Sequence, residues 1–208
     1  MKIKRLALPQ GDYIARDKST CKINQICLHH TVSNGTAEAV SDWFASDKGN
    51  SKVATPFVIA LDGTVLQLFD PETGWAYHTG VYGHGDANCI GIEIVNAGPL
   101  VKKADKYYWC DGRYEYKGLV FDCVKPFRDT SRYWAQYTDA QMIAVAELCK
   151  SLIAKFGVKN TLLDNLVYDK KFGSFNGIIS HVNIRPDKTD LSPAWDFNKF
   201  KELLNGKI

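Results

Sequence analysis

Three side chains that can take part in chemistry stand within one short segment, HVNIRPDKTD. His181 opens this segment, and Lys188 and Asp190 stand near its far end. Pro186 lacks a backbone N–H and disfavours helical geometry in the residue before it, so helical periodicity cannot explain the spacing. We therefore expect the segment to be a loop that folds the imidazole and the carboxylate back to one point.

A predicted strand near the start of the chain carries two further imidazoles, His29 and His30. The stretch INQICLHHTV, residues 23–32, is rich in β-branched and apolar residues and is followed by the turn signal SNG. Alternation along a strand places His30 on the same face as Ile26 and Leu28, and His29 on the opposite face. We therefore expect a structural role for His30 and a role in a site for His29.

His29, His181 and Asp190 together have the composition of a catalytic zinc site. Such sites use three protein ligands and leave the fourth tetrahedral position for water. Lys188 would then lie beside the metal, where its charge can stabilise an oxyanion. Taken singly, Lys188 is explained as a solvent-exposed loop lysine and Asp190 as the cap of a turn, so it is the combination that favours a metal site.

Glu93 stands where a purely structural strand would not place a carboxylate. In the strand predicted over NCIGIEIVNAG, residues 88–98, Ile90, Ile92 and Ile94 share one face and Glu93 projects from the other. A buried, unpaired carboxylate is unfavourable, so this side chain needs a cation, a metal or a catalytic role. For Glu93 alone, a structural ion pair and a catalytic role both stay open.

A second group of possible metal ligands, His78, His84 and Asp86, lies in the stretch HTGVYGHGD. Its three glycines predict a flexible loop, which suits contact with a substrate better than rigid coordination of a metal. The sequence lacks the H-E-x-x-H, P-loop and G-x-S-x-G motifs, which argues against several other hydrolase sites.

The elements that must position these residues alternate between strands and helices. Capping signals and apolar periodicity predict helices over residues 36–49, 138–157 and 192–206. TPFVIALDGTVLQLF predicts a hairpin that turns at Asp62-Gly63, and NGIISH predicts the strand that delivers His181. This order predicts an α/β fold with a central mixed, twisted sheet flanked by helices.

Residues 99–137 are aromatic and rich in turns, and YYWCDGRYEYKG predicts a second Asp-Gly hairpin. We interpret this stretch as an insertion into the main sheet. With no internal repeat and no Ser/Pro-rich linker, we expect one domain over residues 1–208, with its core at about 23–205.

Composition restricts the possible partners. A formal net charge of +3 on 208 residues, with acidic and basic residues interspersed, argues against a nucleic-acid-binding protein. No apolar run approaches the roughly 18 residues that a membrane-spanning helix needs. The N-terminal MKIKRLALPQGDY lacks the apolar stretch of a signal peptide, so we expect synthesis in the cytoplasm. Of the six cysteines we expect most to be reduced, and Cys110 and Cys123 are the first candidates for a disulfide.

Five blocks occur in a fixed order: ICLHHT, FVIALDGTVLQLF, WAYHTG, NCIGIEIVNAG and HVNIRPDKTDLSPAWDF. In this order they resemble the zinc-dependent N-acetylmuramoyl-L-alanine amidase family, which includes phage lysozyme-type amidases, muropeptide amidases and peptidoglycan recognition proteins. The stretch IGIEIVNAGPL, with no room for a wall-binding module, further resembles compact phage endolysins. The resemblance implies hydrolysis of the amide bond between N-acetylmuramic acid and L-alanine in peptidoglycan. It implies Zn²⁺ as the cofactor and action at the bacterial cell wall.

The resemblance also assigns roles to residues. It implies that His29, His181 and Asp190 hold the zinc, with Asp190 in the place where other members have cysteine. Glu93 matches the catalytic glutamate of the family, and Lys188 matches its lysine near the metal, so both are expected to be catalytic.

Five residues are expected to contact substrate: His78, Thr55, His30, Asn88 and Arg185. His78 matches a residue that lines the substrate groove of the family. Thr55 stands where some members have a catalytic tyrosine, so Glu93 would have to perform that role here.

Three alternatives stay open at this point. In the first, the domain binds muropeptides without cutting them. In the second, it acts on soluble anhydro-muropeptides during cell-wall recycling. In the third, zinc is structural in an unrelated fold, which would require four protein ligands and unfolding on chelation. We expect the protein to be a monomer.

Overall fold

The computed structural model describes residues 2–17, 22–81, 85–128 and 130–207. His84, one of the alternative metal ligands, lies outside these residues. Among the described residues, no helix combines the length and the hydropathy that crossing a bilayer requires.

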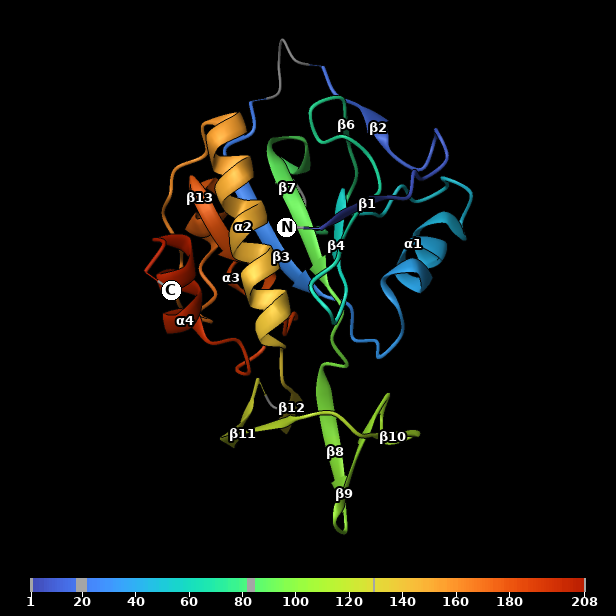
Figure 1. Cartoon of the computed structure of the whole chain (residues 1–208), viewed down its shortest axis with the longest axis vertical. Helices are drawn as coiled ribbons and strands as arrows, with labels where there is room; N and C mark the ends of the chain where they lie inside the picture. Colours follow the sequence, from blue (N-terminus) through green and yellow to red (C-terminus); the bar gives the residue numbers. More distant parts are fainter. Residues whose placement is uncertain (1, 18–21, 82–84, 129, 208) are drawn as a thin grey trace.

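A six-stranded mixed sheet forms the centre of the fold, in the order β1-β5-β4-β7-β3-β13 (Figure 1). Strands β4, β7, β3 and β13 are parallel to one another, whereas β1 and β5 run in the opposite direction. The strands are β1 (Ile3–Arg5), β3 (Gln25–His30), β4 (Phe57–Ile59), β5 (Val65–Gln67), β7 (Cys89–Ile94) and β13 (Gly177–Ser180).

Helices cover both faces of this sheet. α2 (Asp139–Phe156) and α4 (Phe197–Leu204) pack on one face in the main core, which contains Ile26, Leu28 and Ile92. α1 (Ala37–Ala45) packs on the other face in a second core with Val58 and Leu66. The predicted fold, a single α/β domain with a central mixed sheet between helices, is confirmed.

Coverage of both faces explains why all six residues of β3 are buried. The predicted alternation along β3 and β7 holds, because Ile90, Ile92 and Ile94 pack in the main core. His29 of β3 lies beside Glu93 of β7 in the sheet register.

Helix α2 begins at the capping box that the sequence predicts. The Thr138 hydroxyl accepts a hydrogen bond from the Gln141 backbone N–H at 3.1 Å, and the Thr138 N–H donates to Gln141 Oε1 at 3.1 Å. The helix ends at Gly157, whose φ of +70° is the left-handed geometry that glycine adopts without strain.

Two predictions at the C-terminal side need correction. The helix expected over 192–206 begins only at Phe197, because the Asp196 carboxylate caps it by accepting from the Lys199 N–H at 3.0 Å. The segment after β13 is not entirely a loop: α3 (His181–Ile184) is one helical turn. Pro186 constrains only the residue before it, Arg185, which is extended with φ −134° and ψ 122°.

The stretch at 99–137 forms its own five-stranded antiparallel sheet, in the order β10-β9-β8-β12-β11. It lies at one end of the molecule, below the main sheet in Figure 1. Its strands are β8 (Pro99–Lys103), β9 (Lys106–Trp109), β10 (Tyr114–Tyr116), β11 (Val120–Phe127) and β12 (Ser131–Ala135). We call it the inserted sheet.

The remaining elements are short. β2 (Ile14–Ala15) and β6 (Gly74–Trp75) form a two-stranded antiparallel ribbon, and the 3-10 turns η1 (Asp86–Asn88) and η2 (Lys170–Ser174) precede β7 and β13. Cys110 and Cys123, the predicted disulfide candidates, are both free thiols.

Candidate active site

The three predicted metal ligands converge at the carboxyl ends of the parallel strands of the sheet. His29 is the penultimate residue of β3 and His181 directly follows β13, so the carboxyl ends of two neighbouring parallel strands bring the imidazoles together. The two Nδ1 atoms are 3.0 Å apart, and Asp190 Oδ2 lies 3.1 Å from His29 Nδ1 and 3.0 Å from His181 Nδ1. All three side chains are buried.

The hydrogen bond on the far side of His181 fixes which ring nitrogen is free. His181 Nε2 lies 2.7 Å from the Thr79 carbonyl oxygen, which can only accept, so Nε2 carries the proton in the neutral ring. The Nδ1 lone pair of His181 then points toward a carboxylate oxygen and a second imidazole. Such a group of lone pairs is stable only with a proton or a cation between them.

The spacing of these atoms suits a zinc ion. Zinc bonds of about 2.0–2.1 Å at tetrahedral angles separate neighbouring ligand atoms by about 3.3 Å, close to the separations of 3.0–3.1 Å found here. Burial lowers the pKa of His29 to about 3, so its ring is neutral as a metal ligand must be. The residues therefore fit the metal that the sequence predicts.

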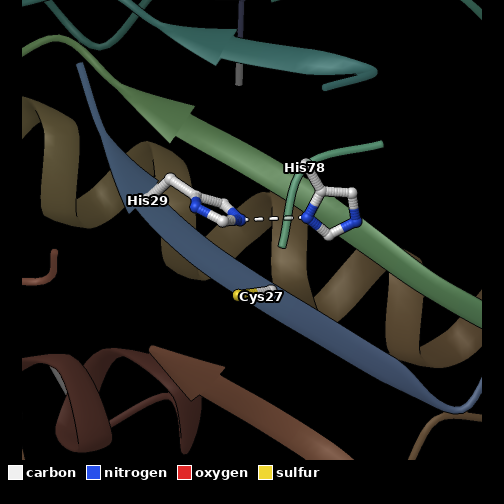
Figure 2. A group of neighbouring side chains, drawn as sticks. All are labelled: Cys27, His29 and His78. Atoms are coloured by element: carbon white, nitrogen blue, oxygen red, sulfur yellow. Dashed lines mark hydrogen bonds between the residues drawn. The ribbon is translucent and has the colours of Figure 1, made fainter. Parts of the chain in front are cut away.

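A second cluster of possible ligands shares His29 with the first and adds Cys27 and His78. Its ligand atoms all fall within 4.8 Å of one another. Figure 2 shows His29 Nε2 directed at His78 Nδ1, 3.0 Å away, with Cys27 on the same strand. A neutral imidazole has one lone pair, so His29 cannot serve both clusters.

Two observations favour the cluster of His29, His181 and Asp190. These residues line the cleft described below, whereas Cys27 is completely buried and does not line it. Burial raises the pKa of the Cys27 thiol well above its usual range, and metals bind the thiolate. In this arrangement His29 Nε2–H donates to His78 Nδ1, which orients the His29 ring in the way that supporting residues orient metal-bound histidines.

Asp86 contacts both Thr79 and His78, the residues that bind His181 and His29. Its Oδ1 accepts a hydrogen bond from the Thr79 N–H at 3.1 Å and lies 3.6 Å from His78 Nε2. It therefore holds both the residue whose carbonyl binds His181 and the ring that contacts His29. His78 and Asp86, which the sequence offers as alternative ligands, thus lie in contact with the residues around the predicted ligands His29 and His181.

Glu93 and Lys188 complete the polar part of the site. Both line the cleft with the three ligand residues, and Glu93 is half-buried. Burial, and next the charge of Asp190, raise the pKa of Glu93 well above its usual range, while Lys188 opposes this shift. A carboxyl group of this kind, in one cleft with imidazoles and an ammonium group, can accept and return a proton.

The cleft has a volume of about 660 Å³ and two unlike walls. The metal ligands, Glu93 and Lys188 form the polar wall, and residues of α1 and the following segment, including Trp43 and Val53, form an apolar one. Trp43 is 64% exposed although it is a large aromatic residue. A cleft with an apolar wall opposite a few convergent polar groups is the usual form of a small-molecule site.

The five predicted substrate contacts divide into two groups. His78, Thr55 and His30 line the cleft. The Thr55 hydroxyl donates to the Phe57 carbonyl at 2.9 Å, which commits its proton to the protein. His30 lies on the core face, as expected, and its Nδ1 is 2.7 Å from the Tyr137 hydroxyl.

Asn88 and Arg185, the other two predicted substrate contacts, are not among the residues that line the cleft. Asn88 precedes β7 and so lies at the opposite end of that strand from Glu93. The Arg185 guanidinium makes a two-point ion pair with Asp187 and also donates to the Thr79 carbonyl at 3.4 Å.

Comparisons with known proteins are consistent with this geometry. A sequence model of the N-acetylmuramoyl-L-alanine amidase family matches residues 19–193. A search of curated proteins found no match. Among solved structures, the N-acetylmuramoyl-L-alanine amidase LysC from Clostridium intestinale superimposes with a TM-score of 0.58 at 18% identity, covering 99% of this chain and 98% of that chain.

Two further structures show the same fold. The Staphylococcus aureus hydrolase AmiA, solved with its ligand, has a TM-score of 0.60 at 12% identity, covering 100% of this chain and 83% of that chain. The E. coli amidase AmiD, solved with the substrate anhydro-N-acetylmuramic acid-L-Ala-D-γ-Glu-L-Lys, has a TM-score of 0.54 at 18% identity, covering 90% and 60% of the two chains.

Proposed function

Because the chain belongs to the N-acetylmuramoyl-L-alanine amidase family, we propose that His29, His181 and Asp190 hold a zinc ion for its reaction. The chain is an amidase that acts on peptidoglycan, at the amide bond between N-acetylmuramic acid and L-alanine. The observation that supports the zinc assignment is the convergence of three lone-pair atoms at separations of 3.0–3.1 Å beside Glu93.

Zinc bound by these residues would supply Lewis-acid chemistry, polarising a carbonyl group and lowering the pKa of a water molecule. Glu93 accepts the proton of the attacking water and returns it to the nitrogen of the departing L-alanine. The Lys188 ammonium group compensates the negative charge that develops on the carbonyl oxygen. Thr79 and His78 keep the two imidazoles in the required tautomer and orientation.

Hydrolysis is favoured over binding alone. A domain that only binds muropeptides needs neither a convergent ligand set nor a carboxylate beside it. The one departure from the catalytic pattern is Thr55, whose hydroxyl proton is already bonded to the Phe57 carbonyl. We therefore assign both proton transfers to Glu93.

We propose intact peptidoglycan as the substrate and an endolysin-like role at the cell wall for a single catalytic domain over residues 1–208. The cleft offers the exposed indole of Trp43 as a surface on which a sugar ring of the glycan can stack. The alternative is a released anhydro-muropeptide, the kind of molecule found in the AmiD complex.

The experiment is incubation of the tag-free protein with purified sacculi and, separately, with a soluble anhydro-muropeptide, followed by mass spectrometry of the products. We expect stem peptides with a free L-alanine amine from the sacculi, loss of this release with a chelator, and its return with zinc. Activity that survives complete metal removal would refute the zinc assignment. Cleavage of the soluble compound alone would refute the proposed substrate.

A further inference from the structure

Arg128, in the turn between β11 and β12, binds the backbone of the segment that carries Asp190. Its Nη1, which has two hydrogens to share, lies within hydrogen-bond distance of the carbonyl oxygens of Arg185 at 2.8 Å, Pro186 at 3.0 Å and Lys188 at 2.5 Å. Its Nη2 donates to the Val182 carbonyl at 2.9 Å. One side chain of the inserted sheet thus joins four carbonyl groups of a single segment of the main body.

The segment itself offers these carbonyls few donors. α3 has one turn, so its last carbonyl groups have no partner within the helix. Pro186 offers no N–H to the segment. The segment's own backbone bonds include Val182 N–H to the Asp190 carbonyl at 2.7 Å and a long Lys188 N–H to Arg185 carbonyl contact at 3.4 Å. Arg128 therefore determines much of the shape of the segment.

Arg128 itself is held in place by the core. Its backbone has a φ of +49°, a strained value for a residue other than glycine, which persists only where the surrounding structure imposes it. Its guanidinium carbon lies 5.5 Å from the centre of the Phe127 ring, and that ring packs against the completely buried Trp134 at 6.0 Å. The guanidinium is thus a fixed group and not a mobile surface cation.

We propose that Arg128 is a positioning residue for the metal site. By binding the backbone between Val182 and Lys188, it holds Asp190 within reach of His29 and His181 and keeps Lys188 at the cleft. The inference rests on the ligand set proposed above, and it gives the inserted sheet a part in the chemistry of the main domain.

The sign of the effect separates positioning from charge. Arg128 is a cation, with Asp187 and Asp190 among the groups that act on its charge. A cation near a metal site repels zinc, so if Arg128 acted only through its charge, its removal would tighten zinc binding. Positioning predicts weaker binding.

The test is the zinc dissociation constant of the tag-free protein, measured by competition with a chromogenic chelator. For Arg128→Ala we expect binding weaker by about tenfold or more, the size of effect typical of groups that support metal ligands. Arg128→Lys keeps the charge but has one nitrogen in place of the fork, so we expect an intermediate loss. Thermal unfolding of the metal-free variants shows that each is folded.

Arg132→Ala is the matched control. Arg132 lies in the same hairpin, is largely exposed, and makes a two-point ion pair with Asp122 at 2.6 Å for both contacts. We expect its zinc affinity to equal that of the parent protein.

Three results would overturn the inference. Zinc binding by Arg128→Ala as tight as the parent or tighter would exclude positioning, and an equal loss in Arg132→Ala would assign the effect to general loosening of the hairpin. If Arg128→Ala does not fold, Arg128→Lys decides by the same criterion. A parent protein that binds no zinc would refute the ligand set itself, and this is seen before any variant is compared.

Discussion

The single lone pair of His29 decides which of two neighbouring clusters holds a metal. Its Nδ1 faces His181 and Asp190, and its Nε2 faces His78 at 3.0 Å. Because the Thr79 carbonyl keeps the proton of His181 on Nε2, the Nδ1 lone pair of His181 faces His29 Nδ1 and Asp190 Oδ2. Hydrogen bonds of the surrounding residues, and not the ligand types alone, therefore favour the proposed ligand set over its neighbour.

Replacement of Glu93 by glutamine should separate proton transfer from metal binding. The amide keeps the size of the side chain but cannot accept a proton, so we expect zinc content to stay at the parent level while kcat/KM falls by about 10²–10⁴-fold, the usual contribution of general acid–base catalysis. Elemental analysis and cleavage of a defined muramyl-peptide measure the two effects. Activity close to that of the parent enzyme would remove Glu93 from its catalytic role.

Asp190→Asn should lose zinc. The substitution removes the negative charge at the oxygen that lies 3.0 Å and 3.1 Å from the two imidazole nitrogens. Asp187→Asn is the control, because Asp187 shares the segment but pairs with Arg185. We expect stoichiometric zinc in the control and little in Asp190→Asn after dialysis against a weak chelator. Full zinc content in Asp190→Asn would show that Asp190 is not a ligand.

Residue types and alternation predicted much of this arrangement. They placed His29 and Glu93 on the face opposite the core isoleucines, and the structure sets the two side by side in the sheet register. The support from the Thr79 carbonyl could not be predicted, because a backbone oxygen leaves no signature in the residue type. Asn88 immediately precedes β7, at the opposite end of that strand from Glu93.

At the scale of elements, β7 approaches His78 so closely that only glycine fits between them. A Cβ atom at Gly91 would lie 2.6 Å from Thr55 Cγ2 and 3.0 Å from His78 Cγ. The lack of a side chain at Gly91 is therefore what allows His78 to reach His29.

Gly91→Ala should disturb both stability and the metal site. Forcing a methyl group into this space costs about 1–3 kcal/mol of unfolding free energy, and displacing His78 should weaken zinc binding as well. Denaturant unfolding and the chelator competition measure the two losses. The double variant Thr55→Ser/Gly91→Ala removes the nearest clashing methyl group, so we expect it to recover part of the stability. An unchanged zinc affinity in folded Gly91→Ala would show that His78 does not support the site.

The sequence predicted elements best where their ends carry local signals. Thr138 and Gln141 showed where α2 begins, and Gly157 where it ends. The single turn of α3 was missed because Pro186 was taken to exclude helix over the whole segment, although proline restricts only its immediate neighbour.

At the scale of the molecule, the core and the site occupy different parts of the fold. The main core lies between the sheet and the helices α2 and α4, whereas the proposed ligands lie beside the cleft, at the carboxyl ends of the parallel strands. Contacts such as that of Arg128 with the segment before Asp190 join parts of the chain about 60 residues apart. Local patterns carry no information on such contacts, which is why the contact between the inserted sheet and this segment was not predicted.

This separation predicts that metal removal leaves the protein folded. A chelator should abolish cleavage while the far-ultraviolet circular dichroism spectrum and a cooperative thermal transition persist, because the hydrophobic core is formed without the metal. Added zinc should raise the transition temperature, since a ligand that binds only the folded state stabilises it. Loss of the cooperative transition on chelation would instead indicate a structural metal.

The most direct test of the ligand set is X-ray diffraction from crystals of the zinc-loaded protein, measured on both sides of the zinc absorption edge. We predict one anomalous peak among His29 Nδ1, His181 Nδ1 and Asp190 Oδ2. A peak at the other ring nitrogen of His29, among Cys27, His29 Nε2 and His78 Nδ1, would contradict the account.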